Sequence, residues 1–279
     1  MKNRVLTVKH IHEYQRHLSA EERAPATIEK YVRDIRSFLC WLDGREVTHE
    51  LAAQWKSHLL SIGQAPATIN AKLSAINSLF RFLGWDDCRV KFLKLQRRLF
   101  RDASRDLSRA EYDRLLEAAA GTAQVELLLQ TICATGIRVS EVRYITVEAA
   151  RLGRAEISLK GKIRTILLPA KLCRKLLKYA QKQKIASGEM FLTKGGKSLT
   201  RFQIWRSMKA LCNKAKVEAS KVFPHNLRHL FAATFYKVTR DVVKLADVLG
   251  HSSINTTRIY LLTSGAEHAR QLDRLGLVS

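Results

Sequence analysis

Apolar side chains recur at spacings of three and four residues along most of this chain, a period that predicts amphipathic helices. In the first ninety residues the pattern gives four helices, over residues 8–18, 25–42, 50–60 and 66–83. Two of them open with the same five residues, Ala-Pro-Ala-Thr-Ile. Proline is favoured in a first helical turn because the N–H that it lacks would have no partner there. Four such helices predict a small all-α domain.

A polar stretch without periodicity, residues 100–106, follows this domain and is interpreted as a linker. Ser108 and Glu111 then have the spacing of a capping box, which marks the start of a helix. The single convincing β-hairpin covers residues 155–168, where apolar positions alternate on both sides of Gly161. Further helices are expected over residues 126–135, from 140–144 onward, and over 172–183, 200–215, 225–238, 241–249 and 253–262.

These elements predict a mainly α chain of two domains. The first, residues 1–99, is a small helical domain, and the second, residues 107–279, is helical with one small β-hairpin. Residues 100–106 connect them.

The charge balance narrows the choice of partner. The chain holds 49 Lys and Arg against 25 Asp and Glu, a net charge of +24, and residues 1–105 share in the excess with 19 basic against 11 acidic groups. Such a charge attracts polyanions. Nucleic acid is the commonest of these, through neutralised phosphates and released counterions, although an anionic membrane surface or a ribosome would fit the charge equally well. Two basic domains would suit a C-shaped clamp around a DNA duplex.

Cysteine usage and hydropathy bear on location. The five cysteines are odd in number and widely spaced, without a CxxC pair, so neither a zinc knuckle nor a disulfide framework is indicated. No apolar run approaches the length that spans a bilayer, and no apolar signal core follows the first residues. We therefore expect no membrane association and a reducing cytoplasm.

Four short segments stand out because polar residues interrupt the apolar pattern, and they lie at residues 134–141, 160–162, 224–229 and 249–260. In the third, His225 and Arg228 are three residues apart and therefore share a helix face. Each residue taken singly has an ordinary explanation. An arginine is most often a surface ion-pair partner, and Tyr260, between two apolar residues, would most often belong to the core. His225, His229 and His251 could be offered as metal ligands, but no acidic or cysteine partner stands at ligand spacing.

Taken together, the segments resemble the tyrosine recombinases, or phage-type integrases. The order Arg, Lys, His-x-x-Arg, Gly-His, Tyr runs through Thr135-Gly136-Ile137-Arg138-x-Ser140-Glu141, Lys160-Gly161, His225-Asn226-Leu227-Arg228-His229, Leu249-Gly250-His251 and Thr257-x-x-Tyr260. The resemblance covers nearly the whole chain and identifies it as a two-domain, Xer-like member. It implies a SAM-like core-binding domain at residues 1–99 and a catalytic domain at residues 107–279. It assigns six catalytic residues: Arg138, Lys160, His225, Arg228, His251 and the nucleophile Tyr260.

The resemblance also implies a mechanism and partners. Tyr260 would form a 3′-phosphotyrosine on double-stranded DNA that carries inverted-repeat core sites, with strand exchange through a Holliday junction in a homotetramer. Residues 265–279 would dock on a neighbouring subunit. No metal, nucleotide or other cofactor is expected, because the phosphotyrosine bond keeps the energy of the phosphodiester. Integration or excision of a mobile element, inversion and dimer resolution all remain open.

Departures from the family pattern are few. Asn226 stands where an acidic residue is common, and Leu230 where a threonine is usual. The hairpin holds further basic residues, so Lys162 remains an alternative to Lys160 as the general acid. Glu141, close to Arg138, is expected to orient the catalytic groups. A type IB topoisomerase and a noncatalytic DNA-binding regulator are the competing functions, and the second would have no need of Tyr260.

Overall fold

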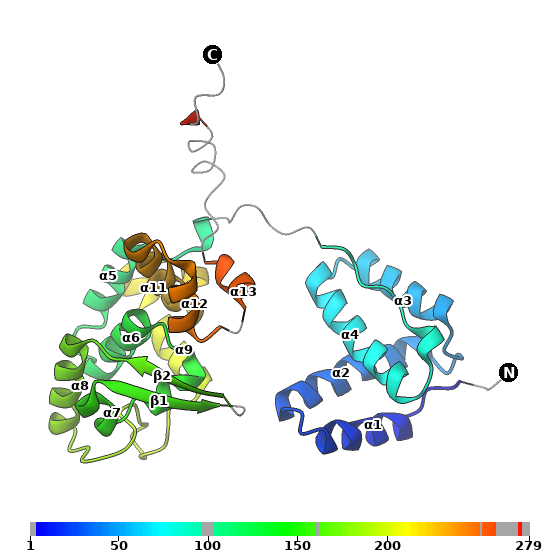
Figure 1. Ribbon diagram of the computed structural model, residues 1–279, viewed down its shortest axis with the longest axis horizontal. Coiled ribbons are helices and arrows are strands. Elements are labelled where there is room, and N and C mark those ends of the chain that lie inside the picture. Colours follow the sequence, from blue (N-terminus) through cyan, green and yellow to red (C-terminus); the bar gives the residue numbers. More distant parts are fainter. Residues whose placement is uncertain (1–3, 96–102, 160–161, 252, 261–272, 275–279) are drawn as a thin grey trace. The chain divides into compact units, whose positions relative to one another are not determined.

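The computed structural model describes residues 4–95, 103–159, 162–251, 253–260 and 273–274. The chain divides into two compact units, Met1–Arg97 and Arg98–Ser279, and the ribbon in Figure 1 shows the elements of each unit. Each unit is described by itself below.

The N-terminal unit is built from helices. Its described residues form α1 (Val8–Ala20), α2 (Pro25–Leu42), α3 (His49–Ser61), α4 (Pro66–Phe82) and the short 3-10 helix η1 (Asp86–Cys88). Pro25 and Pro66 occupy the first turns of α2 and α4, the two helices with the repeated opening. The four α-helices expected from the apolar period are therefore all present.

Three aromatic side chains meet in the core of this unit, which buries few polar side chains. Phe38 of α2 packs against Trp55 of α3 and Phe80 of α4, with ring centroids 4.8 Å and 6.0 Å away, and all three side chains are fully buried. Asn77 and Asp34 are buried polar residues of this unit, and Asp34 pairs with Lys30. Asn77 bonds to the backbone instead. It donates to the carbonyl of Val90 and accepts from the Val90 N–H, so both of its polar ends are satisfied.

The C-terminal unit is helical with one β-hairpin. Its described elements are η2 (Ala103–Arg105), α5 (Arg109–Ala118), α6 (Ala123–Thr135), η3 (Val139–Tyr144), α7 (Val147–Leu152), β1 (Arg154–Leu159), β2 (Lys162–Leu167), α8 (Ala170–Lys182), α9 (Arg201–Lys209), α10 (Cys212–Ala215), η4 (Ala219–Lys221), α11 (Pro224–Thr239), α12 (Val242–Leu249) and α13 (Ile254–Arg258). The capping box at Ser108 and Glu111 opens α5 as expected. In Figure 1, α8 and α13 lie at opposite edges of the unit.

The hairpin pairs β1 with β2 in antiparallel register, from Arg154 opposite Leu167 to Leu159 opposite Lys162. Ile157 and Ile166 point into the core, whereas Leu167 is 77% exposed. This alternation is the period of two that a half-buried strand requires. Lys160 and Gly161, at the expected turn, lie outside the described residues.

Two expected helices are shorter than their apolar pattern. Residues 200–215 form α9 and α10 rather than one helix, because the N–H of Leu211 bonds to the carbonyl of Met208, three residues back, and this interrupts the ladder. The last expected helix covers residues 253–262, of which 261 and 262 lie outside the described residues; α13 ends at Arg258, before Tyr260. The N–H of Tyr260 bonds to the carbonyl of Thr257, again three residues back. Such tightened turns are common at helix ends.

Candidate active site

Arg138 follows the end of α6 and begins η3. Gly136 terminates α6 in the left-handed region, at φ +63°, which turns the chain sharply away from the helix axis. Arg138 is then fixed by Glu141, whose carboxylate accepts from the Arg138 backbone N–H at 2.7 Å and from Nη1 at 2.9 Å. The Arg138 side chain is still 43% exposed, so part of its guanidinium can meet an incoming anion.

The Glu141 carboxylate is buried between two arginines. It is 3% exposed and receives a second ion pair from Nη2 of Arg164, which comes from β2. Burial lowers the pKa of Arg164, and the charge of Glu141 opposes that shift. The hairpin and the segment after α6 are therefore joined through one shared carboxylate.

Arg228 lies in the first turns of α11 and is almost completely buried, at 3% exposure. It donates to the carbonyl of Gly136, to the carbonyl of Leu249 at 2.9 Å and to Nε2 of His251 at 2.9 Å. Burial lowers the pKa of Arg228, the charge of Arg138 lowers it further, and a hydrogen bond with Tyr260 raises it. Arg228 thus ties the ends of α6 and α12 to Tyr260.

His251 follows Gly250 at the end of α12. Because Nε2 accepts from Arg228, the hydrogen-bond network requires Nδ1 to carry the proton and to donate to Oγ1 of Thr257, 2.9 Å away. Burial lowers the pKa of His251 to about 4, helped by the charges of Arg228, Arg138 and Arg164. The imidazole is therefore neutral near pH 7.

Tyr260 packs among histidines rather than facing solvent. Its ring stacks on His251, with centroids 5.8 Å apart and planes 13° apart, and lies 5.9 Å from His225 and 5.1 Å from His229. The residue is 5% exposed, in a small apolar cluster with Ala232 of α11 and side chains of α12. Four segments far apart in the sequence therefore bring guanidinium, imidazole and phenol groups into one place.

Comparison with known proteins assigns this arrangement to a family. A model described as the phage integrase family matches residues 105–266, more than half of the chain. The chain belongs to the phage integrase family. A second model, for the SAM-like N-terminal domain of phage integrases, matches residues 11–87.

Individual relatives of this integrase-family protein are tyrosine recombinases, and the alignment extends over most of both chains. It is 29% identical over 271 residues to tyrosine recombinase XerA of Thermococcus kodakarensis, an alignment that covers 94% of this chain and 93% of XerA. Together with the family match, this makes the protein a tyrosine recombinase, an enzyme of site-specific DNA recombination.

Solved structures share the fold of this recombinase at low sequence identity. A lambda integrase(75–356) dimer bound to a COC′ core site is 16% identical with a TM-score of 0.73, covering 92% of this chain and 95% of that one. XerH bound to its difH substrate in a pre-cleavage complex is 19% identical with a TM-score of 0.69, covering 95% of this chain and 84% of that one. The mainly α, two-domain fold expected from the sequence is thereby confirmed.

Five of the six predicted site residues of the recombinase lie in or beside the cluster. Arg138, Arg228, His251 and Tyr260 are joined through it, and the exposed His225 lies beside Tyr260. Lys160 lies outside the described residues. Its alternative, Lys162, begins β2, and its side chain is not described.

Three members of the recombinase's cluster were not predicted to belong to it. His229, whose ring lies 5.1 Å from that of Tyr260, was noted only in the His-x-x-Arg segment and as a possible metal ligand. Arg164 was noted only as a further basic residue of the hairpin, and Thr257 only as part of the Thr-x-x-Tyr segment. Strand alternation could have indicated Arg164, since it shares the inward face of β2 with the buried Ile166. Nothing in the sequence indicates that Thr257 faces His251.

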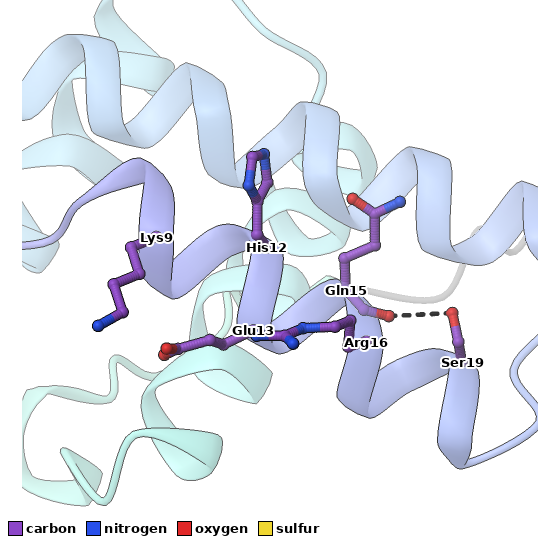
Figure 2. Close-up of a pocket in the computed structure, with 6 residues that line it drawn as sticks. All are labelled: Lys9, His12, Glu13, Gln15, Arg16 and Ser19. Atoms are coloured by element: carbon purple, nitrogen blue, oxygen red, sulfur yellow. Dashed lines mark hydrogen bonds between the residues drawn. The ribbon is translucent and has the colours of Figure 1, made fainter.

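Other features of the recombinase lie apart from this chemistry. Among the described residues, no group of three or more His, Cys, Asp or Glu side chains could hold a metal ion, and no helix is long and apolar enough to cross a membrane. A surface hollow of the N-terminal unit is lined by residues of α1, and Figure 2 shows Glu13 beside Arg16, with the His12 ring pointing away from both. The hydroxyl of Ser19 donates to the carbonyl of Gln15 there.

Proposed function

We propose that this recombinase breaks and rejoins DNA strands with Tyr260 as its nucleophile. The observation that carries the proposal is the placement of Tyr260, whose ring stacks on His251, the partner of Arg228, and lies beside His225 and His229. A buried aromatic of the ordinary core has no such partners. A phosphate that reached this place would find guanidinium, imidazole and phenol groups together.

The tyrosine suits a reaction that must be reversible. Its oxygen attacks the phosphorus, the bond to the 5′ oxygen of the next nucleotide breaks, and a 3′-phosphotyrosine forms. The departing oxygen takes a proton from Lys160, or from Lys162 if that residue is the general acid. A 5′ hydroxyl then reverses the step on a new strand, so neither a metal nor a nucleotide has to supply energy.

The arginines and histidines stabilise this step in different ways. Arg138 and Arg228 place fixed guanidinium groups against the negative charge that develops on the nonbridging phosphate oxygens. His225, exposed next to Tyr260, assists removal of the phenolic proton. Once the phosphate takes over Arg228, the neutral His251 ring can carry its proton on Nε2 and donate it to a phosphate oxygen, while Nδ1 accepts from the Thr257 hydroxyl. Because Arg228 and Tyr260 are 3% and 5% exposed, DNA must move the Tyr260 segment before attack.

The DNA partner and the assembly are also proposals. Residues 1–99 act as the core-binding domain, 100–106 as the linker and 107–279 as the catalytic domain, and the two domains clamp a duplex that carries inverted-repeat core sites. Strand exchange runs through a Holliday junction in a homotetramer, with residues 265–279 docked on a neighbouring subunit, on the bacterial nucleoid. A solved lambda integrase tetramer bound to a Holliday junction supports this model, with a TM-score of 0.71 at 17% identity.

A covalent adduct tests the proposal. The Tyr260→Phe variant would first be used to select its binding site from a library of random-sequence duplexes. A nicked suicide duplex carrying that site should then trap wild-type protein as a covalent protein–DNA adduct on a denaturing gel, and Tyr260→Phe should give none while binding normally. Absence of the wild-type adduct would favour a DNA-binding regulator. Relaxation of supercoiled DNA that lacks the site would favour a type IB topoisomerase.

A further inference from the structure

Arg164 is a partly buried charged residue that the proposed mechanism does not use. Its side chain is 17% exposed, and it leaves the inward face of β2 toward the end of α12. Nη2 pairs with Glu141, and Nη1 lies 3.4 Å from the carbonyl of Val248 in α12. Moving a charge even partly out of water costs free energy, so we expect an arginine held there by defined partners to have a structural or functional role.

The turn at Gly250 is shaped around this side chain. Gly250 adopts φ +62°, and a Cβ built there would lie 2.5 Å from Nη1 and 2.6 Å from Cδ of Arg164. A residue with a side chain would therefore have to displace Arg164. Nη2 of Arg138 also lies 3.5 Å from the Gly250 carbonyl, so Arg138 and Arg164 meet at the residue that precedes His251.

The charges of this group explain why a second arginine is useful. Glu141 holds Arg138 in place, but a carboxylate 2.9 Å from a guanidinium also cancels most of the field that a phosphate would feel. With Arg164 on the other carboxylate oxygen, the three groups carry a net charge of +1. Without Arg164, the pair of Arg138 and Glu141 would be neutral.

We propose that Arg164 is a positioning residue that neutralises Glu141, so that Glu141 can orient Arg138 without cancelling its charge toward the DNA phosphate. Arg164 itself contacts no DNA. The inference rests on the proposed function, since it assumes that Arg138 binds the phosphate. Arg164 also joins β2, the strand that follows Lys160, to the Gly250–His251 turn.

The first test measures, from the salt dependence of DNA binding at equilibrium, how many phosphate charges the protein neutralises. It requires no DNA cleavage. In a Tyr260→Phe background, binding to a fluorescein-labelled duplex with the selected site would be measured over a range of salt concentrations. Each phosphate neutralised contributes about −0.9 to the slope of log K against log salt. Arg164→Met should make the slope shallower by up to about this amount although Arg164 is paired with Glu141 rather than with DNA, and Arg164→Lys should keep most of it.

The matched control removes a positive charge elsewhere in the same unit. Arg174 is exposed on α8, at the opposite edge of the unit from α13, and Arg174→Met should leave the slope unchanged. Thermal unfolding of each variant would show that it is folded at the assay temperature.

The second test is rescue by a compensating change. Adding Glu141→Gln to Arg164→Met removes the uncompensated carboxylate and restores the net charge of +1. This double variant should recover the wild-type salt slope. On the suicide duplex, Arg164→Met should slow single-turnover adduct formation by about tenfold or more, less than the ~10²–10³-fold loss expected for a donor that touches the reacting group. The double variant should recover part of that rate.

The outcomes separate this inference from the function on which it rests. A wild-type protein that forms no adduct contradicts the proposed function, and the salt slopes still decide whether Arg164 controls the charge of Arg138. If the double variant binds with the same shallow slope as Arg164→Met, or if Arg164→Met keeps the wild-type slope, the charge-balancing role is wrong and Arg164 serves only packing.

Discussion

Gly136 shows at the scale of one residue how the site depends on the backbone. It ends α6 at φ +63°, its carbonyl accepts from Arg228, and a Cβ built on it would lie 2.4 Å from Cδ1 of Phe231. Both the left-handed conformation and the close approach of an aromatic ring therefore require glycine. Only Ile137 separates this glycine from Arg138.

We expect Gly136→Ala to be much more harmful than Gly153→Ala. Gly153 also ends a helix in the left-handed region, at φ +70°, but nothing lies within 4 Å of a Cβ built there. The control should lose about 1–2 kcal/mol from the left-handed alanine alone. Gly136→Ala should lose about 1–3 kcal/mol more from overpacking. Urea unfolding monitored by circular dichroism would measure both, and equal losses would contradict the packing seen at Phe231.

His251 makes a pH-dependent contribution to stability. Its pKa is about 4 in the folded protein, against an ordinary value of 6.5. Between these values the unfolded chain binds more protons than the folded one, so the free energy of unfolding rises with pH across that window and is lost as pH falls toward 4. His251→Gln should flatten this part of the pH dependence, measured as the urea midpoint from about pH 4 to about pH 7. Identical pH curves for the two proteins would show that His251 is not depressed in this way.

At the scale of elements, the hydrogen bond between Thr257 and His251 joins α13 to the end of α12. Thr257 is fully buried, whereas its neighbour Thr256 is exposed. The bond fixes the imidazole against which Tyr260 stacks. Tyr260, two residues beyond α13, is thus positioned through His251 by the helix that precedes it.

Thr257→Val should therefore slow adduct formation, because it leaves the Nδ1–H of His251 without its acceptor. An unsatisfied buried donor costs about 1–3 kcal/mol, which corresponds to about tenfold or more in rate if the cost falls on the transition state. Thr257→Ser keeps the hydroxyl and should stay near the wild-type rate, and Thr256→Val is the matched control. The measurement is single-turnover cleavage of the suicide duplex. A slow Thr257→Ser variant would point to packing of the methyl group instead.

Helix boundaries were the least predictable feature of the elements. The apolar period continues from Ile204 and Met208 of α9 into Cys212 and Ala215 of α10, and all four are buried. The sequence therefore could not show the break between them, which is a local change in backbone hydrogen bonding. The start of α5 was predictable because the side chains of Ser108 and Glu111 form the capping box that begins the helix.

At the scale of the whole molecule, the net charge of +24 governs association with DNA. Basic residues exceed acidic ones in both parts of the chain, so both units can contribute phosphate contacts. The pairing of Glu141 with two arginines shows the same excess inside the site, where cations outnumber the carboxylate.

Binding of the selected duplex should weaken steeply with salt. A protein that neutralises several phosphates loses roughly 10³-fold or more in affinity between about 50 mM and about 200 mM salt. Fluorescence anisotropy titrations across that range would measure the loss, with circular dichroism at each salt concentration to confirm that the protein stays folded. A flat salt dependence would contradict a clamp of two basic domains.

The sequence by itself determined the helical elements, the hairpin and the order of six polar residues that resembles a recombinase, because period, capping and motif order are local properties of the chain. Only the tertiary structure showed that Arg164 shares Glu141 with Arg138, that Thr257 orients His251, and that Tyr260 is buried against Arg228. Arg164 and Glu141 are 23 residues apart, and Arg228 and Gly136 are 92 apart. Such contacts depend on how the elements pack and on which charged side chains are buried next to each other. No local sequence pattern specifies either of these.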